Sequence, residues 1–444
     1  MRFFQPLALW SIMILFVALP ASAQTILRDA EAERALHELA RPVIVQSGLS
    51  PSRIRILIIK DESLNAFVLN SQTIFIHSGL LLRMKRPEQL QAVIAHELAH
   101  IANGHLTRRP INFRNARNAA LVGLALSAAV ATRSPEGALG LAAGSQSTAQ
   151  RVLLGHNRAE ESSADQAGVR YLARAGIDPT AMIEVMELFS GQEALSASRV
   201  DPYVLTHPLS RERIRGLRGF AAAYTKATPT SKESIYWFGR VQGKLSAFLR
   251  SPKWTLRKVK ASDTSDSALV RKALAHHKNS NAKKALGAVN QLLAKRPNDA
   301  YAHELKGQIL LESRQFGPAV QSYARASALA PNQPLILAGY GRALLATKSS
   351  ANTQKALGVL SKARDRDNLN PALLRDLAQA YAQTGQPGLA SVTTAERYAT
   401  LGQLKTAGTH AKRASGLLPR GSAPWRRAQD ILAAAEQSEN RRRK

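Results

Sequence analysis

The residues best suited to chemistry lie in one short run, His96-Glu97-Leu98-Ala99-His100. If this run is helical, the imidazoles of His96 and His100 project from the same face, one turn apart. Two imidazoles at that spacing form half of a tetrahedral zinc site. Glu97 follows the first histidine, where its carboxylate can accept a proton from an activated water. The run therefore predicts a hydrolytic centre that binds one zinc ion per chain.

The residues around this run carry the signals of a helix. Pro87 suits a first helical position, Glu88 favours the positive end of the helix dipole, and Gly104 suits the cap after the last turn. Between these signals, apolar residues recur at helical spacing, at Leu90, Val93, Ile94, Leu98 and Ile101. We expect one helix that buries its apolar face and carries both histidines.

A third protein ligand is needed, because catalytic zinc sites usually combine three protein ligands with an open position. Residues 157–175 show helical periodicity and carry Glu161 and Asp165 one turn apart, with Gly176 as a terminal cap. Glu161 is the candidate ligand, and Asp165 is placed to fix the tautomer of a ligand histidine. A solvated acidic face would show the same pattern, so spacing alone leaves both interpretations open.

A second polar group, Thr206-His207-Pro208 followed by Arg213, lies in a stretch that resembles a loop. His207 is placed either to approach the metal or to stabilise an oxyanion. A single histidine is also common as a surface or packing residue, and spacing does not separate these roles.

Short strand-forming segments precede the metal helix. Residues 53–60 and 73–77 are typical of strands, and so is Asn65-Ala66-Phe67 before a turn at Asn70-Ser71. An exposed edge strand beside the zinc can pair with an extended peptide and hold it across the ion. We therefore expect Asn65-Ala66-Phe67 to contact substrate.

The chain begins with features of an export signal. Arg2 supplies a positive start, Leu7–Leu19 an apolar run, and Ala21-Ser22-Ala23 a small-residue cleavage pattern. A membrane anchor is the alternative, but the run is short for a span and ends in the cleavage pattern. We expect residues 1–23 to be removed and the mature protein to reside in the periplasm.

Composition supports this location. The chain has no cysteine, which excludes disulfides, thiolate ligands and cysteine-linked lipids and fits an oxidising compartment. The net charge of +30 suits peripheral contact with an anionic membrane surface or acidic clients, or simply a solubilising surface. Export argues against nucleic acid as a partner. A second apolar run, Ala119–Ala131, is too short to span a bilayer, and we expect burial rather than a membrane-touching lid.

The second half of the chain shows an internal repeat. Similar or related residues recur 34 positions apart, at Ala285/Ala319, Val289/Tyr323 and Pro297/Pro331. This is the tetratricopeptide period, in which small residues lie where two helices touch. We expect a third unit near Gly341, with slipped spacing before Ala356, then a fourth unit and a last helix pair. An irregular alanine-rich bundle is the alternative. Stacked helix pairs would offer a concave surface to protein partners.

Residues 25 to about 250 resemble the zinc metallopeptidases related to CAAX prenyl proteases. The matching segments are Arg28-Asp29-Ala30-Glu31, Asn65-Ala66-Phe67, Ser78-Gly79-Leu80, His96–His100, Arg158–Asp165, His207-Pro208 and Arg213-Ile214. The resemblance implies that Glu161 is the third zinc ligand and that Asp165 lies behind the ligands. It also implies that His207 lies near the metal, where it assists catalysis or blocks the open position. Relatives often carry two glycines where this chain has Asn70-Ser71.

Together these features predict an α+β zincin-type metallopeptidase domain followed by an all-α tetratricopeptide-repeat solenoid. The expected boundaries are a signal peptide at 1–23, peptidase at 24–225, a polar connector with some helix at 226–260, repeats at 261–436 and a basic tail at 437–444. Within this tail, we expect Arg441–Lys444 to be disordered.

This order of segments is similar to that of the exported members of the group in which tetratricopeptide repeats follow the peptidase domain. It implies an endopeptidase that degrades misfolded or stalled envelope proteins, β-barrel outer-membrane proteins among them. The repeats would recruit these clients or the barrel-assembly machinery. The alternative is a chaperone or scaffold that works through its repeats, with a gated and rarely catalytic metal site.

Overall fold

The structure, a computed structural model, describes residues 26–106, 158–189, 203–204, 207, 211–224 and 229–443. The expected signal peptide and the apolar run Ala119–Ala131 lie outside these residues. Among the described helices, none has the length and apolarity needed to cross a membrane.

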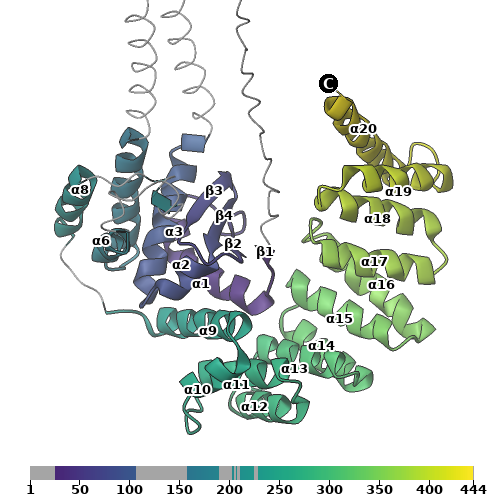
Figure 1. The fold of residues 1–444 in the computed structure, drawn as a ribbon, viewed down its shortest axis with the longest axis horizontal. Coiled ribbons are helices and arrows are strands. Elements are labelled where there is room, and N and C mark those ends of the chain that lie inside the picture. Colours follow the sequence, from purple (N-terminus) through teal and green to yellow (C-terminus); the bar gives the residue numbers. More distant parts are fainter. Residues whose placement is uncertain are drawn as a thin grey trace, which may run out of the picture.

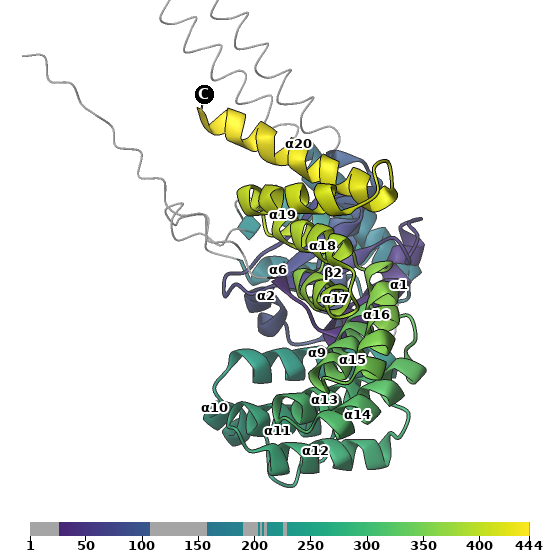
Figure 2. The ribbon, with the colours of Figure 1, turned by 90° about the vertical axis from the view of Figure 1, so that its right-hand side faces the viewer.

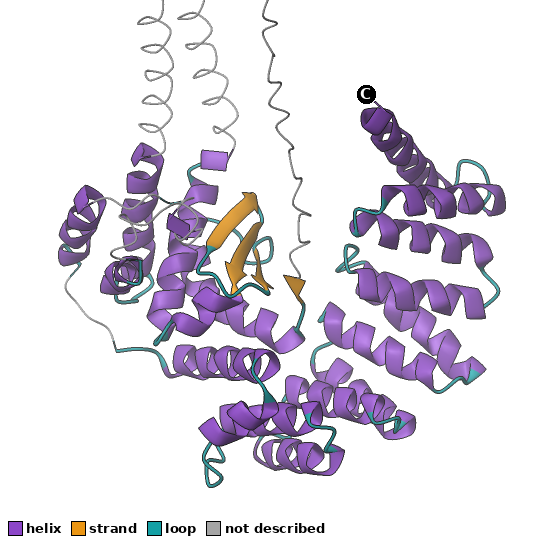
Figure 3. Cartoon of the chain, viewed as in Figure 1, coloured by secondary structure: helices purple, strands orange, loops and turns teal. Residues whose placement is uncertain are grey.

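The first domain contains a small four-stranded sheet, drawn in orange in Figure 3. Its strands are β1 (Ile26–Leu27), β2 (Arg55–Ile59), β3 (Ala66–Asn70) and β4 (Thr73–His77), in the order β1-β2-β4-β3. β2 and β4 pair in parallel in the middle of the sheet. At the two edges, β1 pairs antiparallel with β2, and β3 pairs antiparallel with β4. The three predicted strands are confirmed, and β3 is an edge strand, as a substrate-binding strand requires.

Helix α3 (Pro87–Ala102) is the centre of this domain, and every residue from Pro87 to Ile101 is buried. A helix that is enclosed on all sides needs apolar residues around most of its surface. α3 packs against the strands β3 and β4 and against several helices. They are α1 (Ala30–Gln46), α6 (Thr180–Glu187), α9 (Lys232–Leu249) and the helix at residues 158–174. The domain also contains α2 (Ser78–Arg83) and α8 (Arg211–Ala222).

The expected connector 226–260 contains two helices, α9 (Lys232–Leu249) and α10 (Pro252–Lys258). α9 is amphipathic, and Phe238 and Val241 join the hydrophobic core of the peptidase domain. Its other face packs against the first repeat helix. The expectation of a largely polar linker was therefore wrong, because α9 is part of the core and joins both halves of the molecule.

Five helix pairs form the second half and confirm the repeat (Figure 1). The first helices of the first four pairs begin at residues 266, 300, 334 and 371, so the spacing is 34, 34 and then 37. The irregularity thus falls before Pro371, and the slip expected before Ala356 was wrong. The pairs are α11 (Asp266–Lys278) with α12 (Ala282–Lys295), α13 (Ala300–Glu312) with α14 (Phe316–Leu329), α15 (Pro334–Ala346) with α16 (Ser350–Arg364), α17 (Pro371–Gln383) with α18 (Pro387–Thr400), and α19 (Leu404–Leu417) with α20 (Ala423–Arg443).

Small residues explain why these helices approach closely. A Cβ atom added at Gly307 would lie 2.7 Å from the ring of Tyr323, and one at Gly339 would lie 2.4 Å from the same ring. Tyr323 is thus clamped between α13 and α15. At the chain's end, α20 continues to Arg443, so the expectation of a disordered tail was wrong for this part.

The solenoid curves around the edge of the sheet that carries β1 (Figures 1 and 2). Loops between successive repeats contact α9 and the start of the peptidase domain. Asp299 lies 2.9 Å from Arg240, Gln333 donates a hydrogen bond to the Ala30 carbonyl, and Asp367 lies 2.7 Å from Arg28. The repeat period therefore places one loop after another on the same surface.

Buried charges concentrate at this junction. We call the following six residues the domain-interface cluster: Asp29, Glu31, Arg240, Lys244, Asp299 and Glu304.

Candidate metal centre

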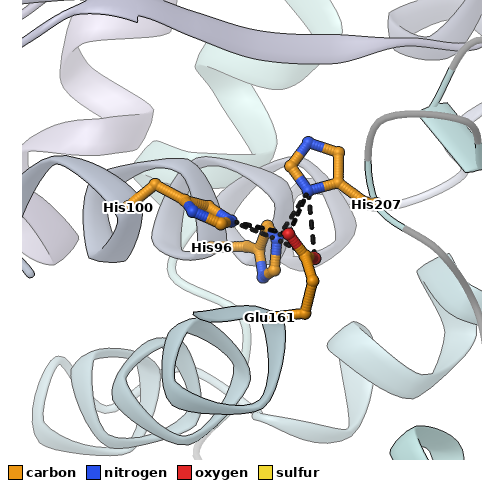
Figure 4. A group of neighbouring side chains, drawn as sticks. All are labelled: His96, His100, Glu161 and His207. Carbon is orange, nitrogen blue, oxygen red and sulfur yellow. Dashed lines mark hydrogen bonds and ion pairs between the residues drawn. The ribbon is translucent and has the colours of Figure 1, made fainter. Parts of the chain in front are cut away.

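Two crossing helices bring the candidate ligands together (Figure 4). α3 presents His96 and His100 one turn apart, and the helix at 158–174 presents Glu161 toward them. The two backbones lie close together at this crossing, since a Cβ atom at Gly168 would be in ordinary van der Waals contact with α3, 3.5 Å from the backbone nitrogen of His96.

The three predicted ligands converge on one point. The Nε2 atoms of His96 and His100 lie 3.1 Å apart, and Glu161 oxygens lie 3.3 Å and 3.4 Å from them. Ligand atoms at the corners of a zinc tetrahedron with bonds of about 2.0–2.1 Å lie about 3.3 Å apart. The donor atoms thus have the separations that a single zinc ion requires.

The chemistry of these donors also fits a cation. Nδ1 of His96 lies 3.0 Å from Oδ1 of Asp165, and Nδ1 of His100 lies 2.9 Å from Nδ1 of His105. If Nδ1 of His96 carries the proton, its Nε2 presents a lone pair toward the Glu161 carboxylate. Lone pairs and a carboxylate facing one another in a buried site repel unless a positive charge lies between them. The residues present therefore fit zinc.

Asp165 is held by Arg213, whose Nε lies 2.5 Å from Oδ2 and whose Nη2 lies 2.9 Å from Oδ1. Burial opposes ionisation, but Arg213 and His96 outweigh it and hold the pKa of Asp165 below its ordinary value. Without metal, burial lowers the pKa of His96, but the carboxylates of Asp165 and Glu161 outweigh burial and raise this pKa to about 9. The structure thus places Asp165 on the Nδ1 side of His96, and Arg213 against both Asp165 and Glu161.

His207 lies directly at the cluster. Its Nδ1 is 3.1 Å from both Glu161 oxygens and 3.2 Å from Nε2 of His96. Its Nε2 lies 3.4 Å from Oε1 of Glu97, which is fully buried. His207 therefore stands at the fourth corner of the donor set and beside the candidate base at the same time.

Two residues near the centre were missed by the sequence analysis. His105 contacts the rear nitrogen of His100, and its position nine residues after His96 gives no ligand spacing. Tyr203 is buried, and its ring centroid lies 4.6 Å from that of His207 and 4.8 Å from that of Phe189. His105 follows His100 in an H-x₄-H pattern, and this pattern was the signal in the sequence that could have revealed it. No signal in the sequence pointed to Tyr203.

The predicted substrate strand lies near this centre. β3 begins at Ala66, directly after Asn65, and packs against α3. Ala66 and Asn65 are buried, whereas Phe67 is partly exposed and stacks on Phe75 with ring centroids 5.5 Å apart. In addition, Tyr203 N–H donates to the carbonyl of Leu64, so the segment that leads to His207 is fastened beside the start of β3.

Comparisons with known proteins agree with this geometry. Residues 29–221 match Peptidase family M48. The chain is 25% identical to the beta-barrel assembly-enhancing protease of Escherichia coli K12 over 397 residues, covering 87% of this chain and 79% of the relative. It is 29% identical to the mitochondrial metalloendopeptidase OMA1 of Schizosaccharomyces pombe over 173 residues, covering 39% and 48% of the two chains.

Among solved structures, yeast Tom70 aligns over 82% of both chains at 13% identity, with a TM-score of 0.32. The assignment of the repeats rests on the helix pairs and their 34-residue period. The assignment of the first domain rests on its zinc-compatible cluster and its relatives. The chain is thus a zinc metallopeptidase, in which residues 29–221 match Peptidase family M48 and hold the zinc-compatible cluster, and it continues into a helical repeat solenoid.

Proposed function

We propose that this chain is a periplasmic zinc endopeptidase of envelope protein quality control. Its clients would be misfolded or stalled proteins, β-barrel outer-membrane proteins among them. The observation that carries the proposal is the convergence of His96, His100 and Glu161, with Glu97 beside them. The E. coli relative's name supports the barrel-assembly setting, and its alignment includes both the peptidase and the repeats.

In this proposal His96, His100 and Glu161 hold the ion, and Asp165 and Arg213 orient His96 and Glu161. Bound zinc supplies a water of lowered pKa and polarises the scissile carbonyl. Both carboxylate oxygens of Glu97 lack a hydrogen-bond partner among the described residues, although the side chain is fully buried. With Nε2 of His207 at 3.4 Å but no hydrogen bond from the described residues, this carboxylate is suited to take a proton from the attacking water and return it to the leaving amine.

The free edge of β3 is suited to hold the substrate. A peptide that adds to the sheet beside Asn65-Ala66-Phe67 would be extended and would cross the face of α3 that carries the histidines. Main-chain hydrogen bonds bind peptides with little dependence on sequence, which suits an enzyme whose clients share only a failure to fold.

His207 defines a closed state in this proposal. A substrate carbonyl needs the open position of the zinc, and His207 stands at that corner. The position favours a blocking role over direct assistance, so His207 would withdraw when substrate binds. Because Tyr203 N–H donates a hydrogen bond to the Leu64 carbonyl, this withdrawal would occur next to the proposed substrate strand.

The repeats would recruit clients or the barrel-assembly machinery through their concave surface. A second candidate function is a chaperone or scaffold that works through the repeats and rarely cuts. The position of His207 favours this second function, because a zinc site whose open position is occupied by His207 is inactive until this side chain withdraws. The basic surface would add peripheral contact with anionic membrane, and export makes nucleic acid an unsuitable partner.

Glu97→Gln tests the proposed function. The purified mature variant should retain one zinc per chain and lose cleavage of an unfolded reporter by about 100-fold or more, because the base is removed but no ligand is. Metal analysis and a protease assay check both parts. In a deletion strain, the variant should fail to protect the envelope. Protection equal to that of the unaltered chain would favour the scaffold, and retained cleavage would exclude Glu97 as the base.

A further inference from the structure

A second site lies away from the metal, where the solenoid faces β1. A cavity of about 680 Å³ opens between this edge strand, helix α9 and the first helices of the repeats. Its wall combines apolar side chains with charged ones, including Ile26, Phe248, Lys244 and Glu304. The two domains build it jointly, since neither contributes a complete wall.

The charged side chains of the wall are the cations Arg28, Lys244 and Arg342 and the carboxylates Asp29, Glu304 and Glu312. Arg28 is paired with Asp367, Arg342 with Asp376 and Glu312 with His277. Lys244 is therefore shared by the remaining carboxylates. Nζ of Lys244 lies 2.8 Å from Asp29, 3.2 Å from Glu31 and 3.9 Å from Glu304. The other cation, Arg240, is shared by Glu31 and Asp299. The domain-interface cluster thus holds four carboxylates and two cations, although the whole chain carries a net charge of +30.

Glu304 is the least compensated of these carboxylates. Its Oε2 has no hydrogen-bond partner among the described residues, and its side chain is 14% exposed. Burial raises the pKa of Glu304 to about 7 although Lys244 opposes the change. A further cation that enters the cavity would find its partner here.

A free strand edge lies on the same cavity. β1 pairs with β2 on one side and is the edge of the sheet on the other. In an antiparallel pair, alternate residues turn both main-chain groups away from the partner, so Ile26 or Leu27 offers an N–H and a carbonyl outward. Ile26 is 42% exposed and Phe248 is 52% exposed, which leaves apolar surface beside those groups.

We propose that this cavity binds an extended peptide segment that pairs with the outer edge of β1 and places a lysine or arginine side chain against Glu304. The occupant must be a peptide, because the strand edge offers main-chain hydrogen bonds and the exposed apolar residues offer contacts for alternate side chains. It must be basic, because Lys244 is shared by three carboxylates and Oε2 of Glu304 has no hydrogen-bond partner among the described residues. A bare metal ion fits poorly, because the ammonium of Lys244 already lies among these carboxylates. This inference deepens the recruiting role proposed for the repeats and rests on it.

The test uses the full mature chain with Glu97→Gln, so that the probe is not cut. The probe is a fluorescein-labelled nine-residue peptide of alternating Val and Thr with one central Lys, compared with the same peptide carrying Gln or Glu there. Fluorescence anisotropy should show the Lys peptide binding about tenfold more tightly than the Gln peptide, since a partly buried ion pair contributes about 1.4 kcal/mol. The Glu peptide should bind most weakly.

Adding Glu304→Gln should abolish the preference for Lys, while Glu436→Gln, the same change at an exposed position on α20, should leave it intact. Phe248→Ala should weaken all three peptides together, and Leu417→Ala, at a similarly exposed position outside the cavity, should not. Equal affinity for the three peptides would overturn the proposal, and so would a Lys preference that survives Glu304→Gln. Cleavage by the unaltered chain is measured separately, so a failure of the peptidase assignment would not be mistaken for a failure of this site.

Discussion

The molecule contains two groups of buried or partly buried charged residues, the metal centre and the domain-interface cluster. They differ in the source of the positive charge that balances their carboxylates. The metal centre gathers the donor atoms of three histidines and Glu161 within 4.8 Å of one another, as a single zinc ion requires, and Arg213 contacts Glu161 from outside this donor set. The domain-interface cluster gathers carboxylates around Arg240 and Lys244, which the chain itself supplies. The first group therefore depends on an ion from solution, and the second depends on side chains from both halves of the chain.

This difference sets what each group does for the protein. A metal site stays available for chemistry because its cation can exchange ligands, whereas a salt bridge between fixed side chains defines how two surfaces meet. Arg240 joins Glu31 of α1 to Asp299, which precedes α13. The metal centre serves catalysis, and the interface cluster orients the solenoid on the peptidase domain.

The largest effect is expected at Glu161. Glu161→Ala should abolish zinc binding, because it removes one of three protein ligands. Asp165→Ala leaves all three in place and should weaken zinc binding by about 10- to 100-fold, through lost orientation of His96. Competition with a chelator, followed by metal analysis, separates the two outcomes. Full zinc occupancy in Glu161→Ala would show that another donor, such as His207, is the ligand.

The interface cluster should respond differently, in stability and not in metal content. Arg240→Met leaves Glu31 buried with only Lys244 beside it, which should cost about 3 kcal/mol in the free energy of unfolding. Adding Glu31→Leu should restore most of that loss, because the buried charge is removed with its partner. Asp299 would remain satisfied by the N–H groups of Tyr301 and Ala302.

Urea unfolding of the zinc-loaded protein measures these changes. Arg342→Met is the matched control, because its partner Asp376 is buried but the arginine is 43% exposed, and the expected cost is below about 1 kcal/mol. Zinc content should be unchanged in all of these variants. A loss of zinc in Arg240→Met would show that the two groups are coupled.

Sequence revealed the metal centre far better than the interface. His96 and His100 are four residues apart on one helix, so local geometry alone places them together. Glu161 and Asp165 share a helix in the same way, and the resemblance selected Glu161 between the open alternatives. Arg240 and Glu31 are 209 residues apart and belong to no motif, so only the folded arrangement of α1 and α9 reveals their contact.

The same reasoning explains the fold. Strands, the metal helix and the repeat period all leave local or periodic signals, and each was predicted within a few residues. α9 was mistaken for part of a polar connector because its buried face contains Arg240 and Lys244, which resemble surface residues until their carboxylate partners are known. A core helix is hard to recognise from sequence when it carries buried charged residues whose partners lie far away in the chain.

The smallest effect, and the one most specific to the interface, is the pH dependence that Glu304 contributes. Its folded pKa of about 7 is above the ordinary value of 4.5, so the folded protein holds this proton between those pH values more strongly than the unfolded chain does. The contribution to stability is therefore fully present below pH 4.5 and is lost as the pH rises through 7. Glutamine cannot lose that proton. The stability that Glu304→Gln gains over the unaltered chain should thus grow by about 1–3 kcal/mol from pH 5 to pH 8.

Urea unfolding at the two pH values measures this difference, with exposed Glu436→Gln as the control that shows none. The same stability difference at both pH values would show that Lys244 already compensates Glu304 in full and that the cluster has no shortage of positive charge.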